Sequence, residues 1–321
     1  MNRITLNDFV KANNADLGAP FQQLLLVIEK TAKIINDKLS RNGLIEEQGS
    51  SGDTNVYGED VQKLDEYANK VFTDALLACP AVAGVGSEEL AEPKISGHDG
   101  LYLITHDPLD GSSNIDTNLP IGTIFGVYPQ NTSVLQKGNT LFASGYILYG
   151  PSMMLVYATT AGKVNGFTYD FQTNEFILSH PDIKIGEKKI YSINEGNWEL
   201  FSESDKNYLT AIKKEGGYSL RYVGSMVADI HRTLLKGGIF LYPADSKHPE
   251  GKLRLLYEVA PLSFLIIQAG GDGVSRGVNP LDIMPSKHDQ RVPIALGSKV
   301  EIEKYSSFQK SNPILDTFKV I

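Results

Sequence analysis

The sequence predicts an α/β fold in which sheets are covered by helices. Two segments near the N-terminus follow the period of an amphipathic helix, and from Val82 onward strand-length apolar runs are separated by Gly and Pro. Beyond residue 189, helix-length and strand-length segments alternate. A chain of 321 residues with this mixture is long enough for two domains or one large α/β unit of strands layered with helices.

The first predicted elements are helices. Apolar residues recur at helical spacing over Phe21–Leu39, and Asn42 with the following Gly closes this helix. Gln48–Asn55 is polar and rich in Gly and Ser, so we expect a mobile loop there. A second apolar face runs over Asp60–Ala78 and predicts a helix that Pro80 ends.

Short apolar runs then predict strands. They lie within Val82–Glu89, Leu101–Asp107, Ile121–Pro129, Phe142–Gly150 and Met154–Thr160, followed by a meander over Gly162–Asp170 and Glu175–Ser179. The polar stretch His180–Lys189 has no strong period, and we place a boundary there, between domains 1–183 and 184–321.

The second half mixes both types of element. Strands are predicted within Lys189–Asn194, Gly238–Ala244 and Val292–Ser298, and helices within Lys206–Gly216, Met226–Gly237 and Leu256–Gly271. Each half therefore consists of strands layered with helices.

Composition excludes several classes of protein. A net charge of −8 and a pI near 5.3 argue against a nucleic-acid-binding body and favour cationic partners such as metals. The single cysteine, Cys79, cannot form an intramolecular disulfide, which predicts a reducing compartment, and its apolar neighbours predict a core position. We see no secretory signal and no apolar run that could cross a bilayer, so we expect a cytoplasmic protein that binds no membrane.

The segment His106–Asp116, HDPLDGSSNID, follows a strand-like run and concentrates carboxylates. Asp107 and Asp110 flank Pro108, which favours a turn on which both side chains converge. Two converging carboxylates repel one another, and a hard divalent cation such as Mg²⁺ relieves that repulsion.

The same segment offers groups that suit a phosphate. Gly111, Ser112 and Ser113 supply backbone N–H groups and hydroxyls directly after the carboxylates. A solvated Asp/Gly/Ser turn would explain a bare D-P-x-D pattern equally well, but it is a poor explanation of the whole string. The segment therefore predicts metal ligands combined with a phosphate-binding turn.

The string DPLDGSSNID, followed by GTIFGVY, resembles the metal-binding signature of the fructose-1,6-bisphosphatase family, the Mg²⁺-dependent sugar-bisphosphate phosphatases. The resemblance reaches from about Thr5 to Gly297. It implies the layered α/β/α/β/α sandwich of the sugar phosphatase superfamily. It also implies two to three Mg²⁺ ions per subunit, with Mn²⁺ or Zn²⁺ as substitutes, and a homotetramer or, second, a dimer.

The resemblance also implies the metal-binding and catalytic residues. The implied metal ligands are Glu88, Asp107, the carbonyl of Leu109, Asp110 and Glu258, and the implied catalytic residues are Glu59, Asp65, Glu88 and Glu89. Glu88 and Glu89 match an S-E-E element, in which Glu89 either binds metal or helps to activate the attacking water. Taken alone, paired glutamates are typical of a solvated turn, and acidic residues at a helix start are explained by the helix dipole.

Substrate contacts follow from segments that are nearly identical to the family's. They are Asp110, Gly111, Ser112 and Ser113 in the first half, with Asn194, Arg221, Tyr222, Met226, Tyr242 and Lys252 in the second half. The resemblance implies that Arg221 reaches the substrate site of a neighbouring subunit. Without the resemblance, the two tyrosines would be core or interface aromatics and Lys252 a solvated charge.

The implied reaction is hydrolysis of fructose 1,6-bisphosphate to fructose 6-phosphate and phosphate, a step of gluconeogenesis. Some segments, such as YGPSMMLVYA and LGSKVEI, resemble sedoheptulose-1,7-bisphosphatase, so that substrate or both substrates remain an alternative. Less favoured readings are an inositol-phosphate phosphatase and a catalytically dead regulatory subunit. The intact ligand set argues against the last.

Two departures concern regulation. Where many members carry T-G-E-L-T at the AMP site, Leu17–Gln23 reads LGAPFQQ, and Leu101 precedes Tyr102 where a basic residue is usual. We therefore expect weak or absent inhibition by AMP.

His231 lies among apolar residues of a predicted helix, and we expect it to be packed and hydrogen-bonded rather than catalytic.

Overall fold

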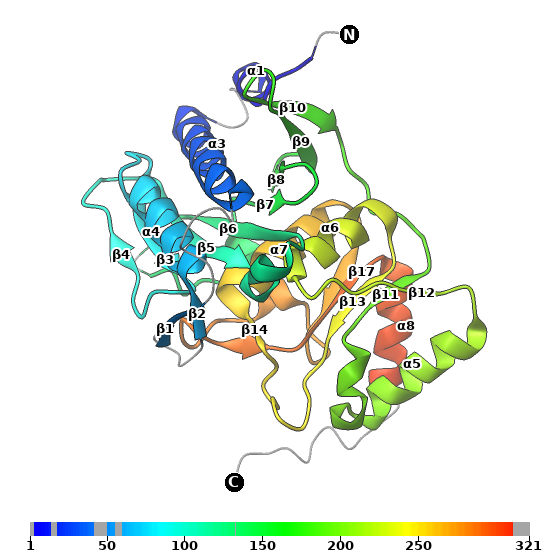
Figure 1. Ribbon diagram of the computed structural model, residues 1–321. Helices are drawn as coiled ribbons and strands as arrows, with labels where there is room; N and C mark the ends of the chain where they lie inside the picture. The colour runs from blue at the N-terminus through cyan, green and yellow to red at the C-terminus, as the bar shows by residue number, and fades with distance from the viewer. Residues whose placement is uncertain (1–2, 14–17, 42–49, 55–59, 132, 311–321) are drawn as a thin grey trace.

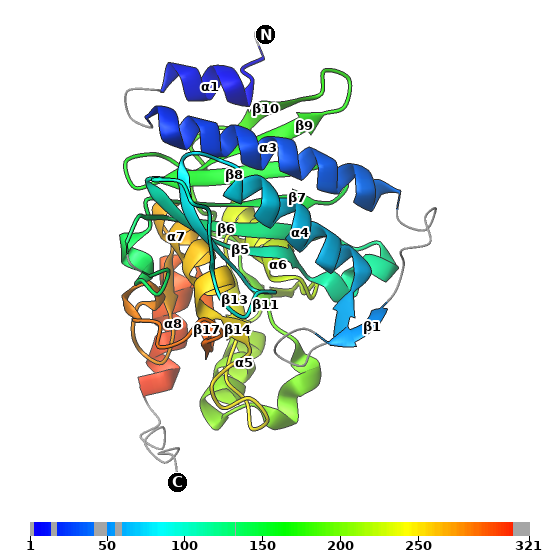
Figure 2. The ribbon, with the colours of Figure 1, turned by 90° about the vertical axis from the view of Figure 1, so that its left-hand side faces the viewer.

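The computed structural model describes residues 3–13, 18–41, 50–54, 60–131 and 133–310. These residues form five stacked layers, in the order helices, sheet, helices, sheet, helices (Figures 1 and 2). Each of three apolar clusters fills part of this stack, the first under the N-terminal helices, the second between the sheets and the third under the C-terminal helices. The predicted α/β sandwich is confirmed.

The first helical layer contains α1 (Leu6–Ala12), α3 (Ala19–Ser40) and α4 (Lys63–Leu77). The predicted helix at Phe21–Leu39 is confirmed, whereas α1 was not predicted because seven residues give too little periodicity. The apolar faces of α3 and α4 pack on the first sheet, as Figure 2 shows from the side.

The predictions for the connection between α3 and α4 need correction. Ser50–Thr54 forms strand β1, which pairs antiparallel with β2 (Asp60–Gln62), so α4 begins at Lys63 rather than at Asp60. Local period could not reveal a pairing between two segments that are separated in the chain. The rest of the predicted loop, with Glu59, lies outside the described residues.

The first sheet has eight strands in the order β10-β9-β8-β7-β6-β5-β3-β4. They are β3 (Val82–Ser87), β4 (Lys94–Ile95), β5 (Tyr102–Asp110), β6 (Ile121–Pro129), β7 (Ala143–Tyr149), β8 (Met154–Thr159), β9 (Asn165–Asp170) and β10 (Glu175–His180). β5 pairs parallel with β3 and antiparallel with β6, and all its residues are buried. The predicted strands and the meander are confirmed.

The middle layer consists of α6 (Met226–Lys236) and α7 (Ala260–Gln268), which pack between the two sheets. The single helix predicted over Leu256–Gly271 is instead a π-helical turn, η4 (Leu255–Val259), followed by α7. Pro261, in the first turn of α7, has no N–H for a helical hydrogen bond to the preceding turn, which accounts for the irregular start.

The second sheet has the order β12-β11-β13-β17-β15. Its strands are β11 (Ile190–Ser192), β12 (Ser219–Leu220), β13 (Ile239–Tyr242), β15 (Asp272–Val274) and β17 (Ile294–Gly297), while β14 (Leu253–Arg254) and β16 (Arg291–Val292) form a separate pair. Short 3₁₀ turns are η1 (Ser112–Thr117), η2 (Gly138–Thr140), η3 (Glu195–Leu200) and η5 (Pro280–Asp282).

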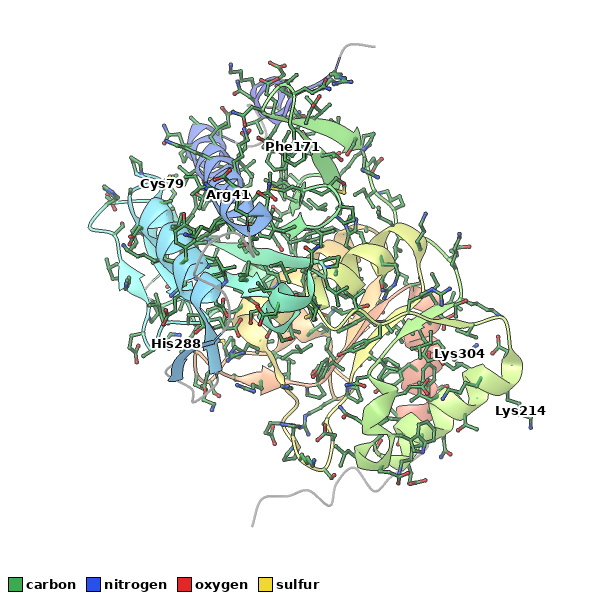
Figure 3. The ribbon with its side chains drawn as sticks, in the orientation of Figure 1. Arg41, Cys79, Phe171, Lys214, His288 and Lys304 are labelled. Atoms are coloured by element: carbon green, nitrogen blue, oxygen red, sulfur yellow. The ribbon has the colours of Figure 1, made fainter. Side chains whose placement is uncertain are left out.

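The last layer consists of α5 (Glu203–Glu215) and α8 (Lys299–Lys310). Lys304 of α8, labelled in Figure 3, donates to Glu215 at the end of α5 over 2.6 Å. Elsewhere, Cys79 lies buried in the first apolar cluster, and His231 Nδ1 lies 2.7 Å from Tyr146 Oη, as predicted for both. None of the described helices has the length and apolarity of a membrane span.

Candidate active site

Strand β5 carries its two carboxylates into a buried turn. Asp107 is 4% exposed and Asp110 is 7% exposed, and Asp107 Oδ1 accepts a hydrogen bond of 2.9 Å from the backbone N–H of Leu109. The chain then turns through Gly111, whose φ is +79° and whose Cβ, if present, would lie 2.5 Å from the side chain of Ser225. Glycine is therefore required at this position.

Asp110 is fixed by the start of α6. Its Oδ2 accepts hydrogen bonds from Ser225 Oγ, at 2.6 Å, and from the backbone N–H of Val227, at 2.9 Å. Burial raises the pKa of Asp110 to about 6, although these two hydrogen bonds act in the opposite direction. A segment 115 residues away thus holds one oxygen of the carboxylate in place.

Glu258 joins the two aspartates from the other half of the chain. It lies in η4, and its Oε2 accepts from the backbone N–H of Arg254 over 2.6 Å. One carboxylate oxygen each of Asp107, Asp110 and Glu258 lie within 4.8 Å of one another. Burial, and then the negative charge of neighbours that include Glu88, raises the pKa values of Asp107 and Glu258.

Glu88 follows the end of β3, which neighbours β5 in the sheet. Its backbone N–H donates to His106 O over 3.0 Å, and its carboxylate pairs with the buried Arg254 guanidinium. Sequence reasoning did not single out Arg254. Its place in the apolar segment KLRLLYE, two residues after Lys252, was the available signal for a buried, paired cation.

Asp65 reaches the same acidic cluster from α4. It is 7% exposed, and burial, followed by the charges of Glu89 and Glu88, raises its pKa, against a hydrogen bond with Ser112. Glu89 is half-buried beside them. The structure therefore brings together all the predicted acidic residues except Glu59, which lies outside the described residues.

A cavity of 390 Å³ opens beside this cluster. Its lining includes the predicted residues Asp110, Gly111, Ser112, Ser113, Tyr222, Met226, Tyr242, Lys252 and Glu258, and also Ser225, Asp229, Arg254 and Arg291, which were not predicted. Buried Asp229 organises one wall because its carboxylate accepts from the backbone N–H groups of Val223 and Gly224, each at 3.1 Å.

Two predicted residues do not line this cavity. Asn194 lies in a neighbouring hollow that shares Tyr242 with the cavity, and its Oδ1 accepts from the N–H of Gly196 over 3.0 Å. Arg221 is exposed, and its guanidinium donates to the carbonyl of Leu220 over 2.8 Å. Contact of Arg221 with a substrate would therefore have to occur elsewhere than in this chain's own cavity.

The donor set fits a hard divalent cation. It offers carboxylate oxygens from Glu88, Asp107, Asp110 and Glu258 with no sulfur or imidazole ligand among the predicted residues, and such ligands suit Mg²⁺. The raised pKa values of Asp107, Asp110 and Glu258 show that these groups are costly to ionise together, which a bound cation relieves.

Comparison with known proteins connects this geometry to one family. The family model described as "Fructose-1-6-bisphosphatase, N-terminal domain" matches residues 1–181, and the corresponding C-terminal domain model matches residues 185–310. A protein of Persephonella marina named "Fructose-1,6-bisphosphatase class 1" is 48% identical over 316 residues, covering 96% of this chain and 97% of its own. One of Maridesulfovibrio salexigens with the same name is 45% identical over 313 residues, covering 91% of each chain.

Solved structures agree. The holo form of Leishmania major fructose-1,6-bisphosphatase has a TM-score of 0.92 and 38% sequence identity to this chain, and the match covers 97% of this chain and all of that one, at 100%. The apo form of the same enzyme has a TM-score of 0.86 and 37% identity.

Proposed function

Because the chain belongs to the fructose-1,6-bisphosphatase family, we propose that its cavity binds fructose 1,6-bisphosphate with the 1-phosphate against the acidic cluster. The enzyme is a phosphoric monoester hydrolase that releases phosphate and fructose 6-phosphate. The observation that carries the proposed orientation is the group of three buried carboxylates, with oxygens within 4.8 Å of one another, at one side of a cavity whose other lining includes Tyr222, Tyr242 and Lys252.

The family is metal-dependent, and we propose Mg²⁺ as the metal, two to three ions per subunit, with Mn²⁺ or Zn²⁺ as substitutes. Its ligands would be Glu88, Asp107, the carbonyl of Leu109, Asp110 and Glu258. Bound there, the metal supplies a Lewis acid for the phosphoryl oxygens and lowers the pKa of a water.

The protein's own residues then divide the remaining tasks. Asp65 and Glu89 lie beside Glu88 and would orient the attacking water and take its proton. Glu59 is assigned to the same task by resemblance alone. The hydroxyls of Ser112 and Ser113 would orient the 1-phosphate, since both residues line the cavity.

The far end of the cavity suits the second phosphate. Lys252 supplies a cation, and Tyr222 and Tyr242 supply phenolic donors, which stay protonated because burial raises their pKa values. Met226 would contact the sugar. Asn194 and Arg221 are proposed for the same phosphate, with Arg221 reaching the cavity of a neighbouring subunit in a tetramer or, second, a dimer.

We propose four further properties. They are domains over 1–183 and 184–321, a cytoplasmic location, a role in gluconeogenesis and weak or absent inhibition by AMP. Half-inhibition at micromolar AMP would contradict the last of these.

One assay tests the substrate assignment. Phosphate release with Mg²⁺ is measured side by side from fructose 1,6-bisphosphate, sedoheptulose 1,7-bisphosphate and inositol 1-phosphate. We expect the highest kcat/KM for the fructose ester, because the named relatives are fructose-1,6-bisphosphatases. A higher value for either other ester would overturn the assignment, and no release from any of them would indicate a catalytically dead subunit.

A further inference from the structure

Helix α4 meets the ends of β3 and β5 through polar side chains rather than through apolar contacts alone. The helix carries Asp65, whereas Glu88 and Glu89 directly follow β3 and Asp107 lies within β5. Asn69 and Thr73 lie on α4, one and two turns after Asp65. They face Ser87 and His106, which are both fully buried.

Hydrogen bonds connect these residues into one network. Asn69 Oδ1 lies 2.8 Å from Ser87 Oγ and 3.2 Å from Thr73 Oγ1. Thr73 Oγ1 lies 3.1 Å from His106 Nε2, and Ser87 Oγ accepts from the backbone N–H of Glu89 over 3.3 Å. The network thus runs from Glu89, just after β3, through α4, to the residue before Asp107 in β5.

Donors and acceptors can be assigned in this network in one consistent way. Each hydroxyl has one proton, and both hydroxyls donate it to the carbonyl oxygen of Asn69. Ser87 Oγ is then left to accept from Glu89, and Thr73 Oγ1 to accept from His106 Nε2–H. His106 Nδ1 is consequently the unprotonated nitrogen, which agrees with its lack of a partner among the described residues.

Charge repulsion among the acidic residues explains why α4 needs this network. When Asp65, Glu88 and Glu89 are all ionised, their charges repel one another, which disfavours a close approach of the start of α4 to these residues. The apolar face of α4, with Leu64, Ala68 and Phe72, holds the helix on the sheet, but apolar contacts are not directional. Directional hydrogen bonds fix where along the sheet the helix lies.

We propose that Asn69 is a positioning residue for the metal-binding and water-activating carboxylates. It accepts from Ser87, which joins α4 to the end of β3, and from Thr73 of the same helix, whose hydroxyl contacts His106 of β5. Through these bonds it sets the placement of Asp65 relative to Glu88 and Glu89. This inference rests on the proposed function, since it assigns a support to that same site.

The test compares Asn69→Ala with the wild type in two measurements. Supports of this kind change metal affinity or activity by roughly 10- to 100-fold. We expect Mn²⁺ affinity, measured by calorimetry without substrate, to fall about tenfold or more. We expect kcat to fall by a similar factor, while KM for the sugar bisphosphate stays within about twofold because the sugar end of the cavity is built from other elements.

Further variants separate positioning from stability. Ser87→Ala cuts the link to β3, and Thr73→Val cuts the link to β5, whereas Thr73→Ser keeps the hydroxyl and should retain wild-type affinity. Tyr146→Phe is the control, because it removes a 2.7 Å hydrogen bond to His231 in the middle layer, where neither residue belongs to the acidic cluster. It should lower Tm without changing Mn²⁺ affinity.

The outcomes are distinct. If Asn69→Ala lowers only Tm and binds Mn²⁺ as the wild type does, the network is merely structural and the inference is wrong. If Asn69→Ala does not fold, wild-type Mn²⁺ affinity in both Ser87→Ala and Thr73→Val overturns it in the same way. Failure of the wild type itself to bind Mn²⁺ would instead contradict the proposed metal site.

Discussion

The two ends of the active-site cavity are built differently. At the acidic end, Asp107, Asp110 and Glu258 are buried, and each accepts a hydrogen bond from a backbone N–H of this chain. At the other end, Tyr222 is 36% exposed and Lys252 is exposed. Among the described residues, no hydrogen bond to the side chains of Tyr222, Tyr242 or Lys252 is found.

This difference separates two kinds of contribution to the reaction. At the acidic end, backbone N–H groups hold the carboxylates without any ligand, and preorganised groups of this kind act on the transition state. At the other end, we expect the ligand to order the side chains, which would then contribute to binding in the ground state and the transition state alike. Variants at the two ends should therefore change different kinetic constants.

The largest effect is expected for Asp110→Asn. Asp110 is a proposed metal ligand, and loss of a ligand that acts in the transition state costs several kcal/mol, so kcat should fall by about 1,000-fold or more. The amide oxygen can still accept from Ser225 and Val227, so we expect the fold to remain intact by circular dichroism. Asp116→Asn, at an exposed aspartate of the same segment, is the matched control. An unchanged kcat in Asp110→Asn would remove the proposed role of the acidic end.

The sequence predicted the carboxylates of the acidic end better than the residues that hold them in place. Asp107 and Asp110 are three residues apart on one strand end, so a local motif places them. Glu258 is distant in the chain and was reached only through resemblance. Arg254 and Asn69 were missed because their roles depend on partners far along the chain, Glu88 and Ser87 respectively. Local patterns do not specify such contacts.

The fold shows the same limit. Segments with a strong period, such as α3 and the strands around β5, were predicted to within a few residues. The strand pair β1 and β2 was not, because a polar five-residue segment becomes a strand only when its partner is present. The π-helical turn that carries Glu258 was also missed, since the sequence there has the apolar character of an ordinary buried helix.

A smaller effect is expected at the exposed end. Lys252→Ala removes the charged hydrogen bond that we propose to the distal phosphate; such a bond is worth about 1.5–3 kcal/mol, so KM should rise roughly 10- to 100-fold. The value of kcat should stay within about threefold, because this contact is the same in the ground state and the transition state. Lys247→Ala, at an exposed lysine outside the cavity lining, is the control. A loss confined to kcat would contradict the division between the two ends.

The smallest effect concerns the stability of the acidic end without metal. Burial raises the pKa of Asp110 from its ordinary value of 3.8 to about 6, so between these values the folded protein holds a proton that the unfolded chain has released. Stability therefore falls as the pH rises through this window, and the raised pKa values of Asp65, Asp107 and Glu258 act in the same direction. We expect Tm of the metal-free protein to be several degrees lower at pH 6.5 than at pH 4.5, and saturating Mg²⁺ to restore it at the higher pH. In Asp110→Asn both changes should shrink, because the titrating group is gone.

A contrary outcome is a metal-free Tm that rises over the same interval. It would show that ionisation of the buried carboxylates does not destabilise the protein. The contrast between a preorganised end and a ligand-ordered end of the cavity would then fail.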